Sequence, residues 1–281
     1  MLTAASAAPL RTVRIDARFD RVGTRLRELW AHREVVYFLV WRDVKVRYKQ
    51  TALGVAWVIL QPLLMMLVFT ALFGRLARVP SDGLPYPVFA YLGLLPWQLF
   101  ATGLGPAANS LVANERLVTK VYFPRLAIPV AAVITGLVDV AVGLAVLAPA
   151  MLHYGFAPTR AVLALPALVL LATAAATAAG VGLAALNVQF RDVRHALPFL
   201  AQLWMFATPV AYPSSLLPAR WRLVYALNPM VGVTEGFRWA LLGRTPAPLE
   251  LLIVSVAATA VGLWAALAWF ARVERGFADT V

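Results

Sequence analysis

The sequence predicts an all-α polytopic membrane protein with six transmembrane helices. Of its 281 residues, 62% are hydrophobic and only 14% are charged, whereas a soluble domain needs a more polar surface. Several charge-free runs are longer than the ~18 residues that mark a transmembrane helix. Basic residues gather beside these runs, as they do at the cytoplasmic ends of membrane helices.

The composition also narrows the functional class. A net charge of +12 would suit a nucleic-acid-binding protein, but its placement beside apolar runs indicates anionic lipid and membrane topology instead. The chain has no cysteine, which excludes disulfides and thiolate metal sites. It has no GxxxxGK[ST] phosphate-binding loop, so we expect no ATP hydrolysis and no cofactor in this chain. Its three histidines are far apart, so we expect no metal site.

The N-terminal part is predicted to be a basic cytoplasmic tail, residues 1–25, followed by an amphipathic interface helix, residues 26–50. Arg33 and Arg47 fall within the apolar arc, which argues against one straight helix. Because aromatic and basic residues are combined, we expect this part to lie on the inner leaflet. The alternative is an ordinary cytoplasmic helix packed on the body of the protein. The apolar arc collects Leu26, Leu29, Trp30, Val36, Tyr37, Val40, Trp41, Val44 and Tyr48.

The transmembrane domain is predicted to span residues 51–272. Crossing one begins where the basic stretch ending at Lys49 gives way to a charge-free run, and Gln61-Pro62 is expected to kink it. Crossing four is rich in alanine and glycine, which permits close helix approach. The six predicted crossings are residues 52–74, 87–112, 126–152, 163–190, 196–212 and 251–271.

The charges set the orientation of these crossings. With both termini in the cytoplasm, 18 of the 25 Lys and Arg residues lie in segments assigned to the inner side, as the positive-inside rule requires. Residues 213–248 then lie outside. This region contains five prolines and an apolar segment too short to cross, so we expect re-entrant or gate helices there. The alternative is a plain outer loop with a surface helix.

Asp139 is the single acidic residue within the predicted crossings. An ionisable residue at this depth is costly and often functional, as a proton relay or a substrate contact. It can also be a structural hydrogen-bond acceptor between helices. Because no basic partner is visible inside the membrane, we favour the structural role.

The inner segment 114–125 is predicted to be a short amphipathic coupling helix that docks on another protein; the alternative is a plain charged turn. A membrane protein that performs directional work without a nucleotide site of its own needs such a docking point. The candidate residues are Glu115, Arg116, Val118, Lys120 and Tyr122.

Aromatic residues are abundant and have two interpretations. They can form an interfacial belt at the helix ends, which is the better interpretation for any single residue. They can also line a path along which sugars slide. The candidates for such a path are Trp57, Phe69, Tyr91, Trp97, Trp204 and Tyr212.

Three motifs resemble a known family. They are RYKQTALGVAWVILQPL at residues 47–63, TKVYFPRLAIP at residues 119–129, and the pair Asn228-Pro229. With them, nearly the whole chain resembles the permease subunit of ABC-2 type polysaccharide exporters, in particular those of the O-antigen type.

The resemblance implies a homodimer in the bacterial inner membrane, bound to two copies of a separate nucleotide-binding ATPase that holds ATP and Mg²⁺. It implies a coupling helix within 114–125, outer gate helices within 213–248, and a polysaccharide substrate carried on undecaprenyl diphosphate. A basic group before crossing one would then attract the diphosphate headgroup, although the topology signal alone explains most of it. The headgroup candidates are Arg33, Arg42, Lys45, Arg47 and Lys49.

Other functions remain as alternatives. Related permeases move capsule chains, teichoic acids, other lipids or small molecules, with the same fold. A membrane-embedded enzyme of polysaccharide assembly would need clustered polar residues in the crossings, which are almost absent. A secondary transporter would be expected to show internal repeats and more intramembrane charge.

Overall fold

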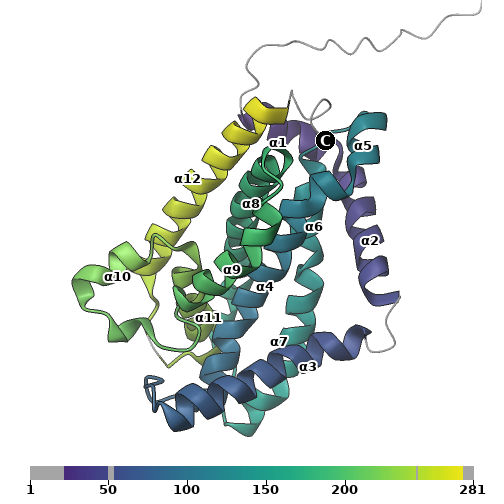
Figure 1. Ribbon diagram of the computed structural model, residues 1–281. Coiled ribbons are helices and arrows are strands. Elements are labelled where there is room, and N and C mark those ends of the chain that lie inside the picture. The colour runs from purple at the N-terminus through teal and green to yellow at the C-terminus, as the bar shows by residue number, and fades with distance from the viewer. Residues whose placement is uncertain (1–21, 50–53, 245, 275–281) are drawn as a thin grey trace, which may run out of the picture.

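A computed structural model of the chain describes residues 22–49, 54–244 and 246–274. In this part of the chain every regular element is a helix, which confirms the predicted all-α class. Figure 1 shows the long helices running side by side, with α1 (Val22–Ala31), α5 (Glu115–Lys120) and the C-terminal end of α12 (Leu249–Val273) gathered at one end. We call this the cytoplasmic end, following the charge distribution.

Five helical segments among the described residues are long and apolar enough to cross a bilayer. They correspond to the first four predicted crossings and the sixth. They belong to α3 (Gly54–Phe69), α4 (Tyr86–Ala113), α6 (Ala127–Thr135) with α7 (Leu137–His153), α8 (Leu165–Gln189) and α12. The candidate spans are Ala56–Leu76, Tyr86–Ala113, Ala127–His153, Arg160–Gln189 and Leu249–Val273.

The predicted fifth crossing, 196–212, differs from the structure. Helix α9 spans Val193–Phe206, only 14 residues, or ~21 Å at the usual rise per residue. Turns follow from Ala207 to Val210 because other elements bind the carbonyls that a longer helix would need. The amide of Asn228 donates to the Ala207 carbonyl, and Arg238 donates to that of Val210.

The predicted interface helix is two helices, α1 and α2 (Arg33–Lys49), with a break at His32. The break splits the predicted apolar arc. Val36 and Val40 on α2 pack with Leu39 against the body of the protein, chiefly along α6. Trp30, Tyr37 and Trp41, which belong to the same predicted arc, are instead exposed. Trp30 lies on α1, before the break, whereas α2 buries its aliphatic side and turns Tyr37 and Trp41 outward. The packed interpretation therefore fits the aliphatic side of α2, and the interfacial interpretation fits its aromatic side.

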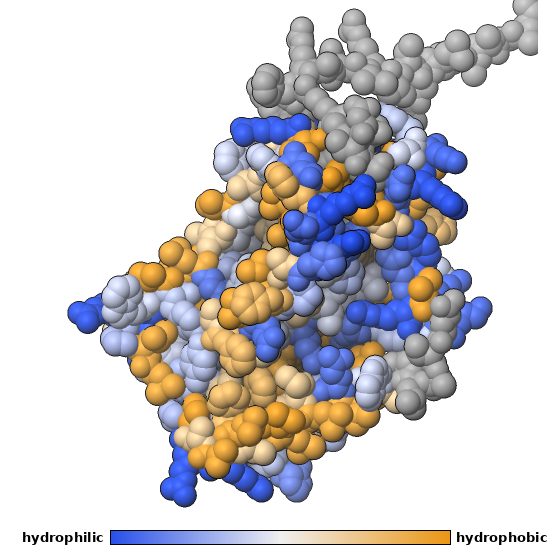
Figure 2. All heavy atoms as spheres, in the orientation of Figure 1, coloured by the Kyte–Doolittle hydropathy of each residue, from blue (hydrophilic) through white to orange (hydrophobic). Residues whose placement is uncertain are grey.

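Helix α3 continues through Pro62 and passes into a π-helical stretch, Thr70–Leu76. Figure 1 shows it lying across the lower ends of α4 and α7, crosswise to the long helices of the bundle. Leu60, Leu64 and Leu67 are among its many exposed apolar residues, which form the orange area over α3 in Figure 2. Such a surface needs lipid or a second protein to cover it.

Helix α4 is the centre of the fold. It is buried along most of its length and contacts α3, α6, α7, α8, α9 and α11. Its approach to α8 depends on small residues, because a Cβ added at Gly180 would lie 2.7 Å from the Ala107 Cβ. This close packing agrees with the role expected for the alanine- and glycine-rich fourth crossing.

The outer region contains η3 (Ser214–Leu216), α10 (Ala219–Tyr225) and α11 (Pro229–Leu242), and a 3₁₀ turn, η2 (Arg160–Ala164), precedes α8. Helix α10 is mostly exposed, whereas α11 is buried against α4, α8 and α12. Neither α10 nor α11 is long enough to cross a bilayer. The buried contacts of α11 make it part of the packed body, whereas α10 lies at the surface.

Candidate functional site

The segment predicted to be the coupling helix forms a small projection at the end of the bundle where α1 and the C-terminal end of α12 lie. Helix α5 is six residues long, from Glu115 to Lys120, shorter than the predicted 114–125. Glu115, Arg116 and Lys120 are exposed, and Tyr122 just after the helix is 77% exposed. Figure 2 shows hydrophilic side chains covering this projection. It therefore presents charges and one aromatic ring to whatever lies beyond it.

Val118 has a different role from the other coupling candidates. Its side chain is only 3% exposed and belongs to an apolar cluster with Leu111, Leu126 and Phe270. Other members of this cluster come from α4, the start of α6 and α12, so Val118 packs α5 into the same apolar cluster as those helices. A displacement of α5 would therefore act on the apolar cluster that it shares with α4, α6 and α12.

Polar contacts tie the neighbouring segments to this end. Arg42 on α2 donates to the side-chain carbonyl of Asn114, which joins α4 to α5, at 3.1 Å. Arg125 donates to the Glu274 backbone carbonyl at 2.7 Å, and Arg25 pairs with the Glu274 carboxylate. These contacts connect α1, α2 and α12 to the segments on either side of α5.

The five headgroup candidates do not form one cluster. Arg33 lies 5.9 Å from the Trp30 ring, and Lys45 lies 5.0 Å from the Trp41 ring. Both cations, with Arg42 and Lys49, are on the exposed side of α2. Arg47 instead points into the protein, where Asp139 binds it. The exposed side of α2 thus combines cations with aromatic rings.

Asp139 has the basic partner that the sequence did not reveal. Its Oδ2 accepts a hydrogen bond from Arg47 Nη1 at 2.8 Å, and its Oδ1 accepts one from the Tyr48 hydroxyl. Burial, together with the hydrogen bond to Asp139, raises the pKa of Tyr48 to about 12. The partner was hidden because Arg47 is 92 residues away in the sequence and reaches Asp139 only when α2 folds alongside α6.

A small cavity of about 230 Å³ adjoins this ion pair. Its walls contain charged, hydroxyl and apolar side chains, and Arg47 is the cation among them. The hydroxyls of Thr102 and Thr135 donate to carbonyls of their own helices. The lining residues are Asp43, Val46, Arg47, Thr102, Pro106, Ala132 and Thr135.

The aromatic path candidates are not brought together on one surface. Phe69, Tyr91 and Trp97 are buried in the core, and the Tyr91 hydroxyl donates to the Gly143 carbonyl. Trp57 is exposed on α3, whereas Trp204 on α9 packs on the Phe100 ring, as Trp97 does. Tyr212 donates to the Phe206 carbonyl and shares a hydrogen bond with the Tyr225 hydroxyl. In this protomer most of these rings serve packing and loop geometry.

The Asn-Pro pair has a definite structural role. The side-chain carbonyl of Asn228 accepts a hydrogen bond from the Met230 backbone and another from the Trp204 indole. Its amide donates to Ala207 and Thr208, and Pro229 occupies the first turn of α11, where its missing N–H costs nothing. Asn228 thus caps α11 and holds the end of α9 at the same time.

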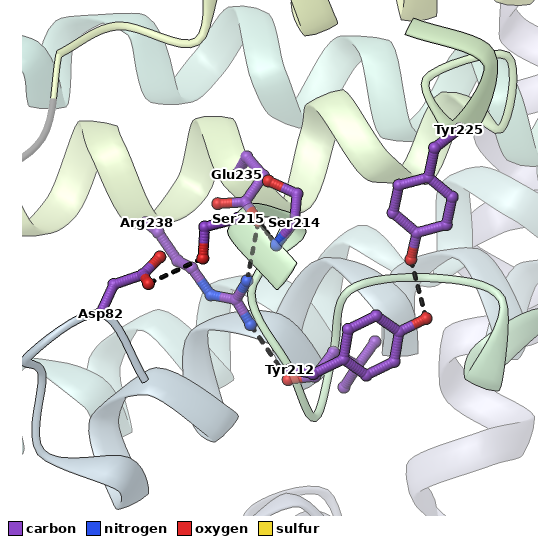
Figure 3. A network of polar contacts seen from close by, with 8 residues as sticks. Asp82, Tyr212, Ser214, Ser215, Tyr225, Glu235 and Arg238 are labelled. Carbon is purple, nitrogen blue, oxygen red and sulfur yellow. Dashed lines mark hydrogen bonds and ion pairs between the residues drawn. The ribbon is translucent and has the colours of Figure 1, made fainter. Parts of the chain in front are cut away.

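An outer polar network around Arg238 was not anticipated (Figure 3). Arg238 on α11 is 4% exposed and donates to the Val210 carbonyl at 3.0 Å and to Glu235 at 3.3 Å. Glu235 also accepts the Ser214 backbone N–H at 2.9 Å. Burial lowers the pKa of Arg238, and the nearby Glu235 opposes that shift. The signal available in the sequence was the Glu-Arg pair at spacing i, i+3 just after Asn228-Pro229.

Two further hydrogen bonds extend this network to other segments. The Ser215 hydroxyl donates to Asp82, in the loop between α3 and α4, at 2.8 Å. The Tyr86 hydroxyl, at the start of α4, donates to the Ala211 carbonyl at 2.6 Å. The segment 207–216 is therefore fastened to α4, α11 and the α3–α4 loop.

A large apolar groove of about 570 Å³ lies between α8, α9 and α12. Small residues, among them Ala178 and Gly182, form its floor, and Trp204 and Trp269 contribute rings. Within the described residues no three His, Asp or Glu side chains lie close enough together to hold a metal ion. The structure thus presents a charged projection at α5, buried polar contacts at Asp139 and Arg238, and an apolar groove between α8, α9 and α12.

The comparisons with known proteins agree with this arrangement. The model of the ABC-2 type transporter family matches residues 34–242. The chain belongs to the ABC-2 type transporter family. This family member is 36% identical to an O-antigen export system permease protein of Myxococcus xanthus, over 91% of this chain and 98% of the relative.

Two other relatives are more distant. A Klebsiella pneumoniae O-antigen export system permease protein is 28% identical over 70% of this chain and 76% of its own length. An Escherichia coli polysialic acid transport protein is 26% identical over 72% of this chain and 78% of its own length. The match of the family model begins in α2 and ends in α11, so it includes α5, Asp139 and Arg238.

Proposed function

We propose that this chain is the permease subunit of an ATP-driven exporter that moves O-antigen-type polysaccharide, linked to undecaprenyl diphosphate, across the bacterial inner membrane. The observation that carries the proposal is the 36% identity to an O-antigen export permease over almost the full length of both chains. The exposed, charged α5 supports it, because a permease without a nucleotide site needs a surface on which an ATPase can act. ATP and Mg²⁺ belong to that partner.

The proposed assembly is a homodimer with two copies of the ATPase and with both termini in the cytoplasm. Support for a second copy comes from α3, whose apolar surface is largely exposed although the helix is long enough to cross the membrane. Helix α9 presents a similar apolar surface, including Phe199, Leu203 and Phe206. We assign the dimer contact to these two helices, and the predicted fifth crossing to α9 together with the turns that follow it.

The proposed path of force begins at α5. Closure of the ATPases displaces α5, and Val118 passes the displacement to the ends of α4, α6 and α12. The outer helices α10 and α11 act as the gate, held to α4 through Arg238. Export then requires the segment 207–216 to move relative to α11, against the hydrogen bonds that fasten it.

The proposed substrate entry is on the inner leaflet beside α2. Lys45, Lys49, Arg33 and Arg42 are exposed cations, and a diphosphate headgroup binds cations through charge-assisted hydrogen bonds. Trp41 and Tyr37 lie on the same side and suit the headgroup region. The apolar groove between α8, α9 and α12 is a surface against which the hydrocarbon chain can lie.

A second candidate is export of a capsule polysaccharide. The specific observation in its favour is the 26% identity to a polysialic acid transport protein over 72% of this chain. Both candidates share the fold, the partner ATPase and the coupling mechanism, and they differ in the polymer and its lipid.

The test is deletion of the gene in its own bacterium, followed by complementation. The proposal predicts loss of surface O-antigen, accumulation of lipid-linked polymer inside, and restoration by the intact gene. Loss of capsule with normal O-antigen would favour the second candidate. Co-purification with an ATPase from detergent-solubilised membranes tests the partner separately.

A further inference from the structure

Asp139 lies at an unusual position for an acidic residue. It is in the first turn of α7, three residues after Gly136, which separates α7 from α6. It is also 12 residues beyond the start of the span Ala127–His153, or ~18 Å along a helix. Its side chain is 12% exposed and that of Arg47 is 35% exposed. An ionised carboxylate at this depth needs a partner, because unpaired charge is expensive in an apolar environment.

Two consecutive residues of α2 supply that partner. Arg47 donates from its guanidinium and Tyr48 donates from its hydroxyl, each to a different oxygen of Asp139. Binding both oxygens fixes the orientation of the carboxylate and the last turn of α2 together. The contact therefore behaves as an anchor between α2 and α7 rather than as a surface ion pair.

The same helix is held to the coupling end five residues earlier. Arg42 donates to Asn114, the residue between α4 and α5. Helix α2 thus contacts the base of α5 at one point and the first turn of α7 at another. Before Arg42, the aliphatic side of α2 packs along α6 through Val36, Leu39 and Val40. A continuous helix joined at two points can carry a displacement from one to the other.

We propose that Asp139 is a positioning residue: it anchors α2 to the membrane-embedded α7, so that displacement of α5 reaches α7 through α2. The inference rests on the proposed ATP-driven export function. It assigns Arg47 and Arg42 to the two contacts that transmit force, and leaves Lys45, Lys49 and Arg33 as the cations available to the substrate headgroup.

The experiment uses the full permease with its ATPase in lipid nanodiscs or in cells. The measured quantities are the amount of permease in the membrane, ATP turnover, and polymer exported per ATP hydrolysed. The variants are Asp139→Asn, Arg47→Gln, their combination, and the charge exchange Arg47→Asp with Asp139→Arg. Glu34→Gln, which removes an exposed acid from α2, is the matched control.

The proposal predicts that Asp139→Asn keeps ATP turnover within about twofold while export per ATP falls at least fivefold. Export per ATP should fall by the same factor in Arg47→Gln and in the combined variant, because the two residues act as one unit. Export per ATP in the charge-exchange variant should be at least threefold higher than in either single variant. Glu34→Gln should change nothing.

Equal loss of export and ATP turnover, or unchanged export per ATP in Asp139→Asn, would overturn the proposal. If Asp139→Asn does not accumulate in the membrane, Tyr48→Phe is the variant that tests the proposal. It keeps the ion pair, and the proposal predicts a two- to threefold loss of export per ATP at normal abundance; no loss would overturn it. If wild-type permease neither binds nor stimulates the ATPase, the proposed function itself fails, whatever these variants do.

Discussion

The guanidinium of Arg238 lies over the ring of Phe89, with 3.6 Å between the Arg238 Cζ and the ring centroid. This contact joins α11 to α4 at the outer end of the bundle. It places a cation where almost no water reaches it, so its charge depends on Glu235, the Val210 carbonyl and the aromatic face. The outer segments of the permease are organised around this one side chain.

Replacing this cation should destabilise the protein. Arg238→Met leaves Glu235 without its partner and frees the Val210 carbonyl, and we expect a loss of ~3–5 kcal/mol in unfolding free energy. Arg220→Met, on the exposed face of α10, should cost less than ~0.5 kcal/mol. Thermal unfolding in detergent measures both. Equal melting temperatures for the two variants would contradict the assigned role.

The space beside Arg238 is as important as its charge. A Cβ added at Gly93 would lie 2.7 Å from the Val210 carbonyl oxygen and 2.9 Å from Arg238 Nη2. We therefore expect Gly93→Ala to destabilise the protein by ~1–3 kcal/mol through overpacking. Gly105→Ala, in the same helix α4 but with nothing within 4 Å of the new Cβ, should be neutral or stabilising by up to ~1 kcal/mol. Chemical unfolding should show a loss of stability for Gly93→Ala and none for Gly105→Ala, and an equal loss in both variants would disprove the packing argument.

Substitutions of exposed and of buried residues in segment 114–125 should have different effects, on ATPase docking and on protein stability respectively. Arg116→Glu and Tyr122→Ala change exposed side chains, so we expect normal abundance with at least a fivefold loss of ATPase co-purification or of export per ATP. Val118→Ala should instead lower stability by ~2 kcal/mol, because it opens a cavity under α5. Abundance by immunoblot and polymer on the cell surface distinguish the two effects. Normal export in both exposed variants would exclude α5 as the docking point.

The exposed cations of α2 should affect substrate supply and leave the fold intact. Lys45→Gln combined with Lys49→Gln removes two cations from the exposed side. Weaker headgroup binding should raise the substrate concentration needed for half-maximal export at least threefold, with normal membrane insertion. The control is Arg160→Gln, an exposed cation at the opposite end of the bundle. An unchanged substrate dependence would leave the α2 cations with a topological role alone.

Hydropathy and charge predicted most of the fold because each long crossing carries its own signal. The spans formed by α4, by α8 and by α12 could be predicted from charge-free length alone, and the span of α6 with α7 from a long apolar run that Asp139 alone interrupts. The end of α9 could not, because it depends on Asn228 and Arg238, which reach back from α11. The single apolar arc predicted for residues 26–48 does not form one face, because the break at His32 separates α1 from α2.

The candidate sites were less predictable, since they depend on pairs that are distant in sequence. No local pattern connects Arg47 to Asp139 or Arg42 to Asn114, and these contacts exist only after α2 packs on α6. Exposure of Tyr122 and burial of Val118 also follow from tertiary packing, although both residues lie in one short segment. The composition of that segment nevertheless predicted that the cytoplasmic end would be charged and partly apolar.

The measurement that tests the account most directly is labelling of a single cysteine at Thr119, an exposed residue of α5 outside the predicted docking set. The chain contains no natural cysteine, so Thr119→Cys introduces the only thiol. A membrane-impermeant maleimide should leave it unlabelled in intact spheroplasts, label it in inverted vesicles, and label it more slowly once the partner ATPase is bound. Labelling from the outside of spheroplasts would place α5 on the wrong side of the membrane and contradict the proposed mechanism of ATP-driven export.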